Sequence, residues 1–315
     1  MTSKSEWTAV DVPDQSGKKY VITGANSGIG LETARIIADR GAQVVMACRN
    51  AEKAAAACDD IRATVPDADL QIVALDLGSL DSVRAAADEL NSADQPIDVL
   101  INNAGIMATP KGVTPDGFEL QLGTNHLGHF ALTGLLIGTI LRSEQPRVVT
   151  VSSNAHKSGK VDFEDLQSEE SYSRIGAYAQ SKLANLLFTM ELARRFRRAG
   201  LDDALSVAAH PGLALTNLSA GVTGGWWERA VKLFDRIGPY LTQPAADGAL
   251  PTLRAATDPH AEGGDYYGPA NLREARGPAV KVKPKRIAFD VHDARGLWEE
   301  SVRLTGVGYE ALAAD

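Results

Sequence analysis

Short apolar segments that do not alternate in polarity recur along most of the chain, with helical patterns between them. The segments are residues 19–23, 44–48, 71–75, 98–101, 147–151 and 205–209. A strand that is apolar at consecutive positions must be buried on both faces, as happens in a parallel sheet covered by helices on both sides. The alternation therefore predicts a doubly wound α/β fold of three layers.

The alternation runs from residue 18 to about residue 255 without a repeat or a low-complexity linker. We therefore expect a single domain over residues 17–315, preceded by an N-terminal extension at residues 1–16. The alternation breaks into a Gly/Thr-rich stretch between Pro211 and Gly248. The tail beyond Gly263 is rich in Gly, Pro and Lys and ends in a helical pattern near residues 290–304.

A glycine-rich turn joins the first strand to the first helix. Gly24, Gly28 and Gly30 follow the strand, and an apolar stripe over residues 29–40 predicts the helix. Backbone amides at such a helix start, together with the positive end of the helix dipole, can hold a pyrophosphate. The turn could also be only a tight connection, but its place at the first strand–helix junction favours a dinucleotide.

Residues at the ends of the second, third and fourth strands indicate which cofactor is bound. The second strand ends at Cys48 and is followed by Arg49, with no acid at the tip. Because a guanidinium matches a 2′-phosphate and a carboxylate matches a ribose 2′-hydroxyl, we favour NADP(H), with NAD(H) as the alternative. Asp76 could bond the adenine amine or only cap a turn, and the Asn-rich tip at residues 102–105 follows the fourth strand.

Tyr178 and Lys182 stand four residues apart in a predicted helix. Positions i and i+4 share a helix face, and a nearby cation favours the phenolate, so we expect Lys182 to lower the pKa of Tyr178. Such a pair is suited to proton transfer. The spacing occurs by chance on many helices, and it indicates hydride transfer only in combination with the glycine-rich turn.

Charge and cysteine content exclude several classes of protein. The net charge of −8 argues against a nucleic-acid partner, and the basic run at residues 194–198 matches the dipole at a helix end. Two cysteines, Cys48 and Cys58, indicate a reducing compartment and no disulfide framework, and we expect no metal site. The apolar run at residues 130–141 is too short to span a bilayer, so we expect a cytoplasmic protein without a membrane span.

Five motifs in this order give the chain a resemblance to the short-chain dehydrogenase/reductases. They are Thr23-Gly-x-x-x-Gly-x-Gly30, Asn102-Asn-Ala-Gly105, Val151-Ser-Ser153, Tyr178-x-x-x-Lys182 and Pro211-Gly212. The resemblance covers nearly all of residues 17–260, and it implies a Rossmann fold. Finer features, such as residues 124–130 and 181–185, look like the retinol dehydrogenase and protochlorophyllide reductase branch.

The resemblance implies roles for the matching residues. Tyr178 would be the general acid or base, Lys182 would assist it and hold the nicotinamide ribose, Ser153 would bond the substrate oxygen, and Asn125 would hold a water against Lys182. The residues implied to contact the cofactor are Gly24, Asn26, Ser27, Gly28, Ile29, Gly30, Arg49, Asp76, Leu77, Asn103, Ala104, Gly105, Tyr178, Lys182, Pro211, Gly212 and Thr216.

The resemblance also implies a substrate lid at about residues 213–243, where Trp226, Trp227 and Phe234 could line an apolar pocket, anchor the lid or touch a membrane. The insertion at residues 154–174 would line the substrate mouth. The C-terminal extension, about residues 264–315, has no catalytic interpretation. A homodimer or homotetramer is expected, because the helices carrying Asn125 and Tyr178 often pair between subunits in this family.

Other polar residues are interpreted as structural. We expect His156 to be satisfied by backbone, His126 and His129 to pack in a helix, and His210 to support a strand end. The acidic residues Asp162, Glu164 and Asp165 are interpreted as a solvated loop.

The sequence thus predicts an NADPH-dependent oxidoreductase that acts on a small hydrophobic aldehyde, ketone or secondary alcohol. Two alternatives remain: an NADPH-dependent reductase of carbon–carbon double bonds, and a non-catalytic NADP(H)-binding sensor.

Overall fold

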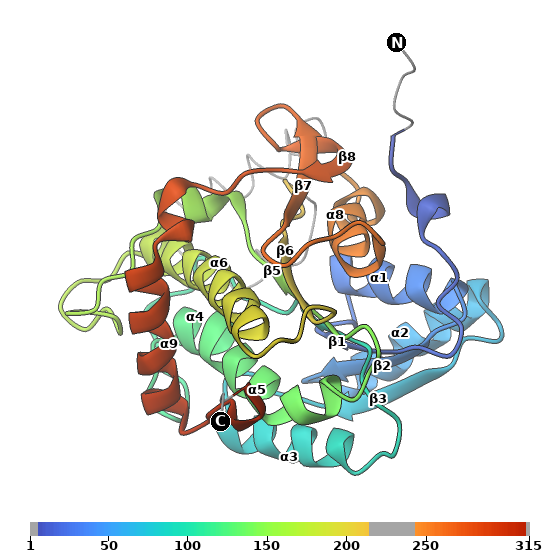
Figure 1. Ribbon diagram of the computed structural model, residues 1–315, viewed down its shortest axis with the longest axis horizontal. Coiled ribbons are helices and arrows are strands. Elements are labelled where there is room, and N and C mark those ends of the chain that lie inside the picture. Colours follow the sequence, from blue (N-terminus) through green and yellow to red (C-terminus); the bar gives the residue numbers. More distant parts are fainter. Residues whose placement is uncertain (1–5, 214–242, 313–315) are drawn as a thin grey trace.

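The computed structural model describes residues 6–213 and 243–312. In this part of the chain one sheet has the strand order β3-β2-β1-β4-β5-β6-β7-β8 (Figure 1). β1 to β7 are parallel, and β8 is antiparallel to β7. The strands are β1 (Lys19–Thr23), β2 (Gln43–Cys48), β3 (Leu70–Ala74), β4 (Val99–Asn102), β5 (Arg147–Val151), β6 (Leu205–Ala209), β7 (Tyr266–Asn271) and β8 (Arg276–Lys281).

Helices cover both faces of the sheet (Figure 1). One face packs against α1 (Gly28–Asp39), α2 (Ala51–Thr64) and α8 (Ala245–Thr257). The other face packs against α3 (Leu80–Asn91), α5 (Gly128–Ile140) and α6 (Arg174–Arg198). The three layers confirm the predicted doubly wound fold, and the order of the strands reverses between β1 and β4, where such sheets bind ligands.

The six strands predicted from apolar runs are present, with ends shifted by at most one residue. β7 and β8 were not predicted, because Gly268 and Pro269 in one strand and Gly277 and Pro278 in the other break the strand pattern. Pro278 is tolerated because β8 forms the edge of the sheet, and Pro269 is tolerated because it lies beyond the residues of β7 that pair with β6. The predicted C-terminal helix is confirmed as α9 (Val291–Thr305).

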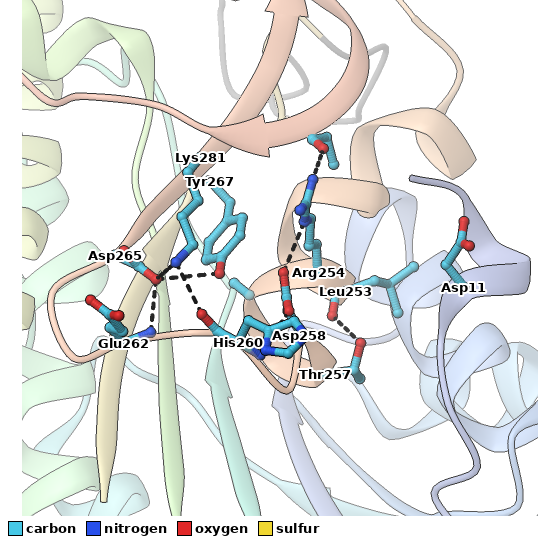
Figure 2. Close-up of polar contacts among 12 residues, drawn as sticks. Asp11, Leu253, Arg254, Thr257, Asp258, His260, Glu262, Asp265, Tyr267 and Lys281 are labelled. Atoms are coloured by element: carbon cyan, nitrogen blue, oxygen red, sulfur yellow. Dashed lines mark hydrogen bonds and ion pairs between the residues drawn. The ribbon is translucent and has the colours of Figure 1, made fainter. Parts of the chain in front are cut away.

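The end of α8 is tied to the β7–β8 hairpin by charged side chains (Figure 2). The Arg254 guanidinium bonds Asp258 at 3.1 Å and the Ala279 carbonyl of β8 at 2.6 Å. Across the hairpin, the Lys281 ammonium lies 2.6 Å from the Asp265 carboxylate. These contacts fix β7 and β8 against the rest of the sheet, and they thereby fix the position of the loop between these two strands.

α9 lies against α6 on the outside of the molecule (Figure 1). Its Trp298 stacks on Phe188 of α6, with ring centroids 5.8 Å apart, and meets Phe130 of α5 edge to face at 5.1 Å. The Arg195 guanidinium lies 4.1 Å from the centre of the Trp298 ring. Beyond α9, the Tyr309 hydroxyl donates to the Phe130 carbonyl at 2.8 Å. The C-terminal extension is therefore part of the core and covers both α5 and α6.

The part of the chain that the structure describes contains no helix both long enough and apolar enough to cross a bilayer.

Candidate active site

The turn after β1 has a backbone conformation that requires glycine. Gly24 and Gly28 have φ of +66° and +56°, values that side chains with a Cβ rarely adopt. A Cβ on Gly24 would lie 3.0 Å from that of Ala104, and one on Gly30 would collide with the Gly24 carbonyl. Gly30 is therefore required by close packing of the helix on the turn. The turn and the helix that follows form one compact unit.

The start of α1 offers backbone amides to an anion. Its N-cap residue, Ser27, makes no side-chain capping bond. Among the other long helices, α5 and α8 also lack a side-chain cap, whereas α2, α3, α6 and α9 are each capped by the side chain of the preceding residue, namely Asn50, Ser79, Ser173 and Asp290. Amides at an uncapped first turn can bind a phosphate. This observation fits the nicotinamide cofactor that the sequence predicts, with its pyrophosphate held at residues 26–30.

The segment after β4 is held against this turn. The Thr23 hydroxyl accepts from the amides of Asn103 and Ala104 at 2.9 and 3.0 Å, and the Asn103 carboxamide donates to the Thr23 carbonyl at 2.8 Å. A Cβ on Gly105 would lie 3.1 Å from the Asn125 side chain and 3.3 Å from the Lys182 ammonium. Residues 103–105 therefore connect the glycine-rich turn with the predicted catalytic residues.

The residues expected at the adenosine end lie at the tips of β2 and β3. Arg49 is exposed directly after β2. The Asp76 carboxylate accepts from the Gly78 amide at 2.9 Å. This contact caps the turn, which is one of the two roles that the sequence suggested for Asp76. Leu77 is buried, and a Cβ on Gly128 at the start of α5 would collide with the Leu77 carbonyl.

The four predicted catalytic residues come from three different elements. Ser153 follows β5 and caps the short helix η3 (Asn154–Ser158) through a 3.2 Å bond from the Ala155 amide. Tyr178 and Lys182 lie on α6 and are buried, and Asn125 is buried in the π-helical turn η2 (Gly123–Leu127) that precedes α5. Such π-turns are often found at functional sites.

The Asn125 side chain is fully bonded to its surroundings. Its oxygen accepts from the Ile106 amide at 2.8 Å, and its nitrogen donates to the Ile106 carbonyl and to the Ser181 hydroxyl, both at 2.9 Å. Because Ser181 precedes Lys182, Asn125 joins the segment after β4 to the helix that carries the lysine. The expected water relay from Asn125 stays a prediction.

Burial dominates the acid–base properties of the pair on α6. The pKa of Lys182 is lowered to about 8, because the ammonium is removed from water. The pKa of Tyr178 is raised by burial, and a hydrogen bond with Ser153 opposes the rise. Lys182 is not among the groups that shift the pKa of Tyr178 here, so its expected effect on the phenol stays a prediction. The Lys182 ammonium bonds the Val151 carbonyl at 3.1 Å and lies 5.8 Å from the centre of the Tyr178 ring.

Beyond the end of β6, the chain at Gly212 and Leu213 lies against the tip of the β7–β8 hairpin, and the Leu213 amide donates to the Ala275 carbonyl at 2.8 Å. Gly212 has φ of +67°, and a Cβ there would collide with the Ala275 carbonyl. The predicted contact Thr216, most of the predicted lid and the aromatic residues Trp226, Trp227 and Phe234 lie outside the described residues.

Glu274, in the hairpin loop, links three parts of this region and was missed by sequence reasoning. Its carboxylate lies 2.8 Å from the Lys157 ammonium and 3.3 Å from Nε2 of His210. Its carbonyl accepts from the Asn154 side chain at 3.1 Å. The Lys157 and His210 contacts lower the pKa of Glu274 to about 2. No local pattern identifies Glu274, because its partners are at least 60 residues away along the chain.

The polar residues interpreted as structural have structural contacts. His156 is buried, with Nδ1 2.6 Å from the Ser153 carbonyl and Nε2 accepting from the Lys285 amide at 3.1 Å. His126 and His129 are buried in the π-turn and α5, as expected. Among the acids, Glu164 is exposed, and Asp165 accepts loop amides. Over residues 6–213 and 243–312, no cluster of His, Cys, Asp or Glu could hold a metal ion.

A mostly parallel sheet with an uncapped helix start at its switch point and a buried Tyr–Lys pair is typical of the nucleotide-binding α/β oxidoreductases. The chain belongs to the short-chain dehydrogenase/reductase family, because residues 18–223 match the sequence model described as short chain dehydrogenase.

Relatives of known sequence place the chain near the retinol dehydrogenases. It is 40% identical to retinol dehydrogenase 12 of Homo sapiens over 308 residues, which cover 96% of this chain and 90% of that protein. It is 44% identical to human retinol dehydrogenase 11 over 294 residues, which cover 92% of this chain and 86% of that protein. The predicted branch of the family is thus confirmed.

Solved structures agree with the fold. An uncharacterised protein from Mycobacterium paratuberculosis is 42% identical with a TM-score of 0.79, covering 97% of this chain and 99% of that one. A protein from Beutenbergia cavernae, solved with bound NADP and described as a candidate NAD(P)-dependent gluconate 5-dehydrogenase, is 28% identical with a TM-score of 0.61. That match covers 78% of this chain and 91% of the other.

Proposed function

We propose that this protein is an NADPH-dependent oxidoreductase that transfers hydride between the nicotinamide and a hydrophobic aldehyde, ketone or secondary alcohol. The observation that carries the proposal is the buried Tyr178, bonded to Ser153 and adjacent to Lys182, beside the segment that follows β4. Relatives named retinol dehydrogenases support a hydrophobic alcohol or aldehyde as substrate.

In this proposal the cofactor supplies the hydride. The uncapped amides of α1 would hold its pyrophosphate, and the exposed Arg49 would pair with a 2′-phosphate. The segment at residues 103–105 and Lys182 would hold the nicotinamide end, with Pro211 and Gly212 beside it. The bound NADP in the relative from Beutenbergia cavernae supports this choice of cofactor.

The side chains of this chain would handle the proton and the substrate oxygen. Ser153 would donate to that oxygen, and the Tyr178 hydroxyl would deliver a proton to it in the reductive direction. The raised pKa keeps the Tyr178 phenol protonated across the neutral range, and the protonated phenol is the form that reduction requires. The Lys182 ammonium, with its pKa lowered to about 8, can change charge near neutral pH and so assist that transfer.

The test is consumption of NADPH and of NADH with a panel of hydrophobic carbonyls, including all-trans-retinal, nonanal and aromatic ketones. Tyr178→Phe is the matched control, since it removes one hydroxyl and keeps the ring. We expect NADPH-dependent turnover that falls on the order of 10³-fold in Tyr178→Phe, with NADPH binding kept. Turnover that survives the hydroxyl deletion would contradict the role of Tyr178.

The same panel of substrates also tests the two alternative functions that the sequence left open, a double-bond reductase and a non-catalytic sensor. Reduction of enones at the carbon–carbon bond, with simple aldehydes untouched, would identify a double-bond reductase. Tight NADPH binding without turnover of either class would favour a sensor.

The cytoplasm stays our proposal for the location. Cys48 and Cys58 are buried free thiols, which suits a reducing compartment.

A further inference from the structure

The imidazole of His129 bridges two elements that are far apart along the chain. His129 lies in the first turn of α5 and is 1% exposed. Its Nδ1 is 3.0 Å from the Asn125 carbonyl oxygen, and its Nε2 is 2.9 Å from the hydroxyl of Thr23, the last residue of β1. The side chain thus joins the beginning of the glycine-rich turn to the π-turn that carries Asn125.

The hydrogen-bond partners determine which nitrogen carries the proton. The Asn125 carbonyl can only accept, so Nδ1 must donate to it. The Thr23 hydroxyl already accepts from the amides of Asn103 and Ala104, so both of its lone pairs are used. Its own proton is therefore directed to Nε2, since the alternative acceptor, the Ile101 carbonyl, is at the longer distance of 3.4 Å. The neutral Nδ1–H tautomer satisfies every group.

These hydrogen bonds form a closed ring, called the circuit below, that links Thr23, residues 103–106, Asn125 and His129 around the predicted nicotinamide end of the site. Thr23 binds the amides of residues 103–104, Ile106 binds the Asn125 side chain, and His129 returns from Asn125 to Thr23. Gly105 lies inside the circuit, where a Cβ would be only 3.3 Å from the Lys182 ammonium. A change in the length of one link would shift the backbone next to Lys182.

We propose that His129 is a positioning residue. Its neutral imidazole fixes the distance between the glycine-rich turn and the π-turn that carries Asn125. Through residues 103–106 it determines where the nicotinamide end of the cofactor meets Lys182. The inference rests on the proposed function for the identity of the cofactor, whereas the bridge itself is a property of the protein.

The neighbouring histidine on the same helix provides a matched comparison. His126 is as deeply buried as His129, but its Nε2 meets the Ser301 hydroxyl of α9 at 3.0 Å, away from β1. Burial lowers the pKa of His129 to about 3 and that of His126 to about 4, so both stay neutral across the working pH range. Of these two histidines, only His129 connects the end of β1 to the π-turn that carries Asn125.

The bridge is first tested without any cofactor, by ¹⁵N NMR of histidine-labelled protein with His129 assigned from the His129→Gln spectrum. We expect the Nδ1–H tautomer for His129, unchanged between pH 5.5 and 8.5. Thr23→Val, which removes the hydroxyl donor, should move the Nε2 signal of His129 and leave that of His126 in place. An Nε2–H tautomer, or an Nε2 signal indifferent to Thr23→Val, would overturn the bridge.

The positioning role is tested by NADPH titration, followed by fluorescence, well below each variant's melting temperature. His129→Phe keeps a ring but loses both bonds, and we expect about tenfold weaker NADPH binding. His129→Gln keeps one donor and one acceptor and should recover binding to within about threefold of the wild type. His126→Phe, the control for loss of a buried histidine, should also stay within about threefold.

Equal affinity of His129→Phe and the wild type, or an equal loss in His126→Phe, would overturn the positioning role. If His129→Phe does not fold, Thr23→Val breaks the same ring of hydrogen bonds at its other end, and an NADPH affinity equal to that of the wild type would overturn the positioning role. If the wild type binds neither NADPH nor NADH, the proposed function fails, whereas the NMR result still decides the bridge.

Discussion

The Lys182 ammonium donates a hydrogen bond to the Val151 carbonyl at 3.1 Å. Val151 ends β5, and Ser153 follows two residues later, so this bond ties the helix of the Tyr–Lys pair to the strand that presents the serine. The burial that makes this contact possible also lowers the pKa of Lys182 to about 8, against 10.5 for a lysine in water. The lysine is therefore held in the site at a cost in stability.

We predict that Lys182→Met stabilises the fold while it inactivates the enzyme. In the folded chain the lowered pKa of about 8 means that protonated Lys182 disfavours folding below pH 8, and the penalty is relieved as the pH rises from 8 to 10.5. Removing the charge should raise the free energy of unfolding at pH 7 by on the order of 2 kcal/mol, with about 100-fold lower turnover. Urea unfolding at pH 7 and pH 10 measures the effect, and a stabilisation that does not shrink at the higher pH would contradict the explanation.

Arg49 is expected to set the preference for NADPH. Arg49→Asp replaces an exposed cation at the tip of β2 with an anion, which would repel a 2′-phosphate and accept a bond from a 2′-hydroxyl. We expect the ratio of NADPH to NADH efficiency to fall at least about tenfold. Arg62→Asp, the same charge change on the exposed side of α2, is the control and should leave the ratio unchanged. A ratio that Arg49→Asp does not alter would show that another residue reads the phosphate.

Glu274→Gln should produce a stability loss that depends on pH. The contacts of Glu274 with His210 and Lys157 lower its folded pKa to about 2 from 4.5, so its stabilising contribution is complete above pH 4.5 and is lost as the pH falls toward 2. Because the carboxylate is partly exposed, we expect a loss of only about 1 kcal/mol at pH 7. Denaturant midpoints at pH 7, 5 and 3 measure it, and the difference between the two proteins should be smaller at pH 3 than at pH 7. A constant difference at all three values would contradict the charge-based account.

The packing of α9 leads us to expect a monomer. Trp298 and Tyr309 occupy the surfaces of α5 and α6 through which a dimer was expected from resemblance, so subunits could pair there only if α9 moved away. Light scattering should give a mass near that of one chain, 33.4 kDa. Trp298→Ala should lower the free energy of unfolding by about 3–5 kcal/mol, since it empties a buried aromatic site. A stable dimer of the wild type would show that a different face pairs.

Local patterns in the sequence predicted much of the fold and the site. The apolar runs at residues 44–48 and 147–151 identify buried strands because burial on both faces favours apolar residues at consecutive positions. Tyr178 and Lys182 share a helix face because their spacing matches the helical period, and both are buried there. In each case the constraint acts between residues close together along the chain.

The sequence by itself determined the doubly wound class and the glycine-rich turn, because local periodicity and motif spacing encode them. The four candidate catalytic residues followed from those motifs together with the family resemblance, and their roles stay predictions. Only the tertiary structure decided that His129 bridges Thr23 and Asn125, that Glu274 faces His210, and that α9 covers α5 and α6. It also decided the pKa of Lys182, which depends on how much water the whole fold excludes. These contacts join residues 60 or more positions apart, except for the single helical turn from Asn125 to His129, and no pattern within one segment specifies which distant segment will pack against it.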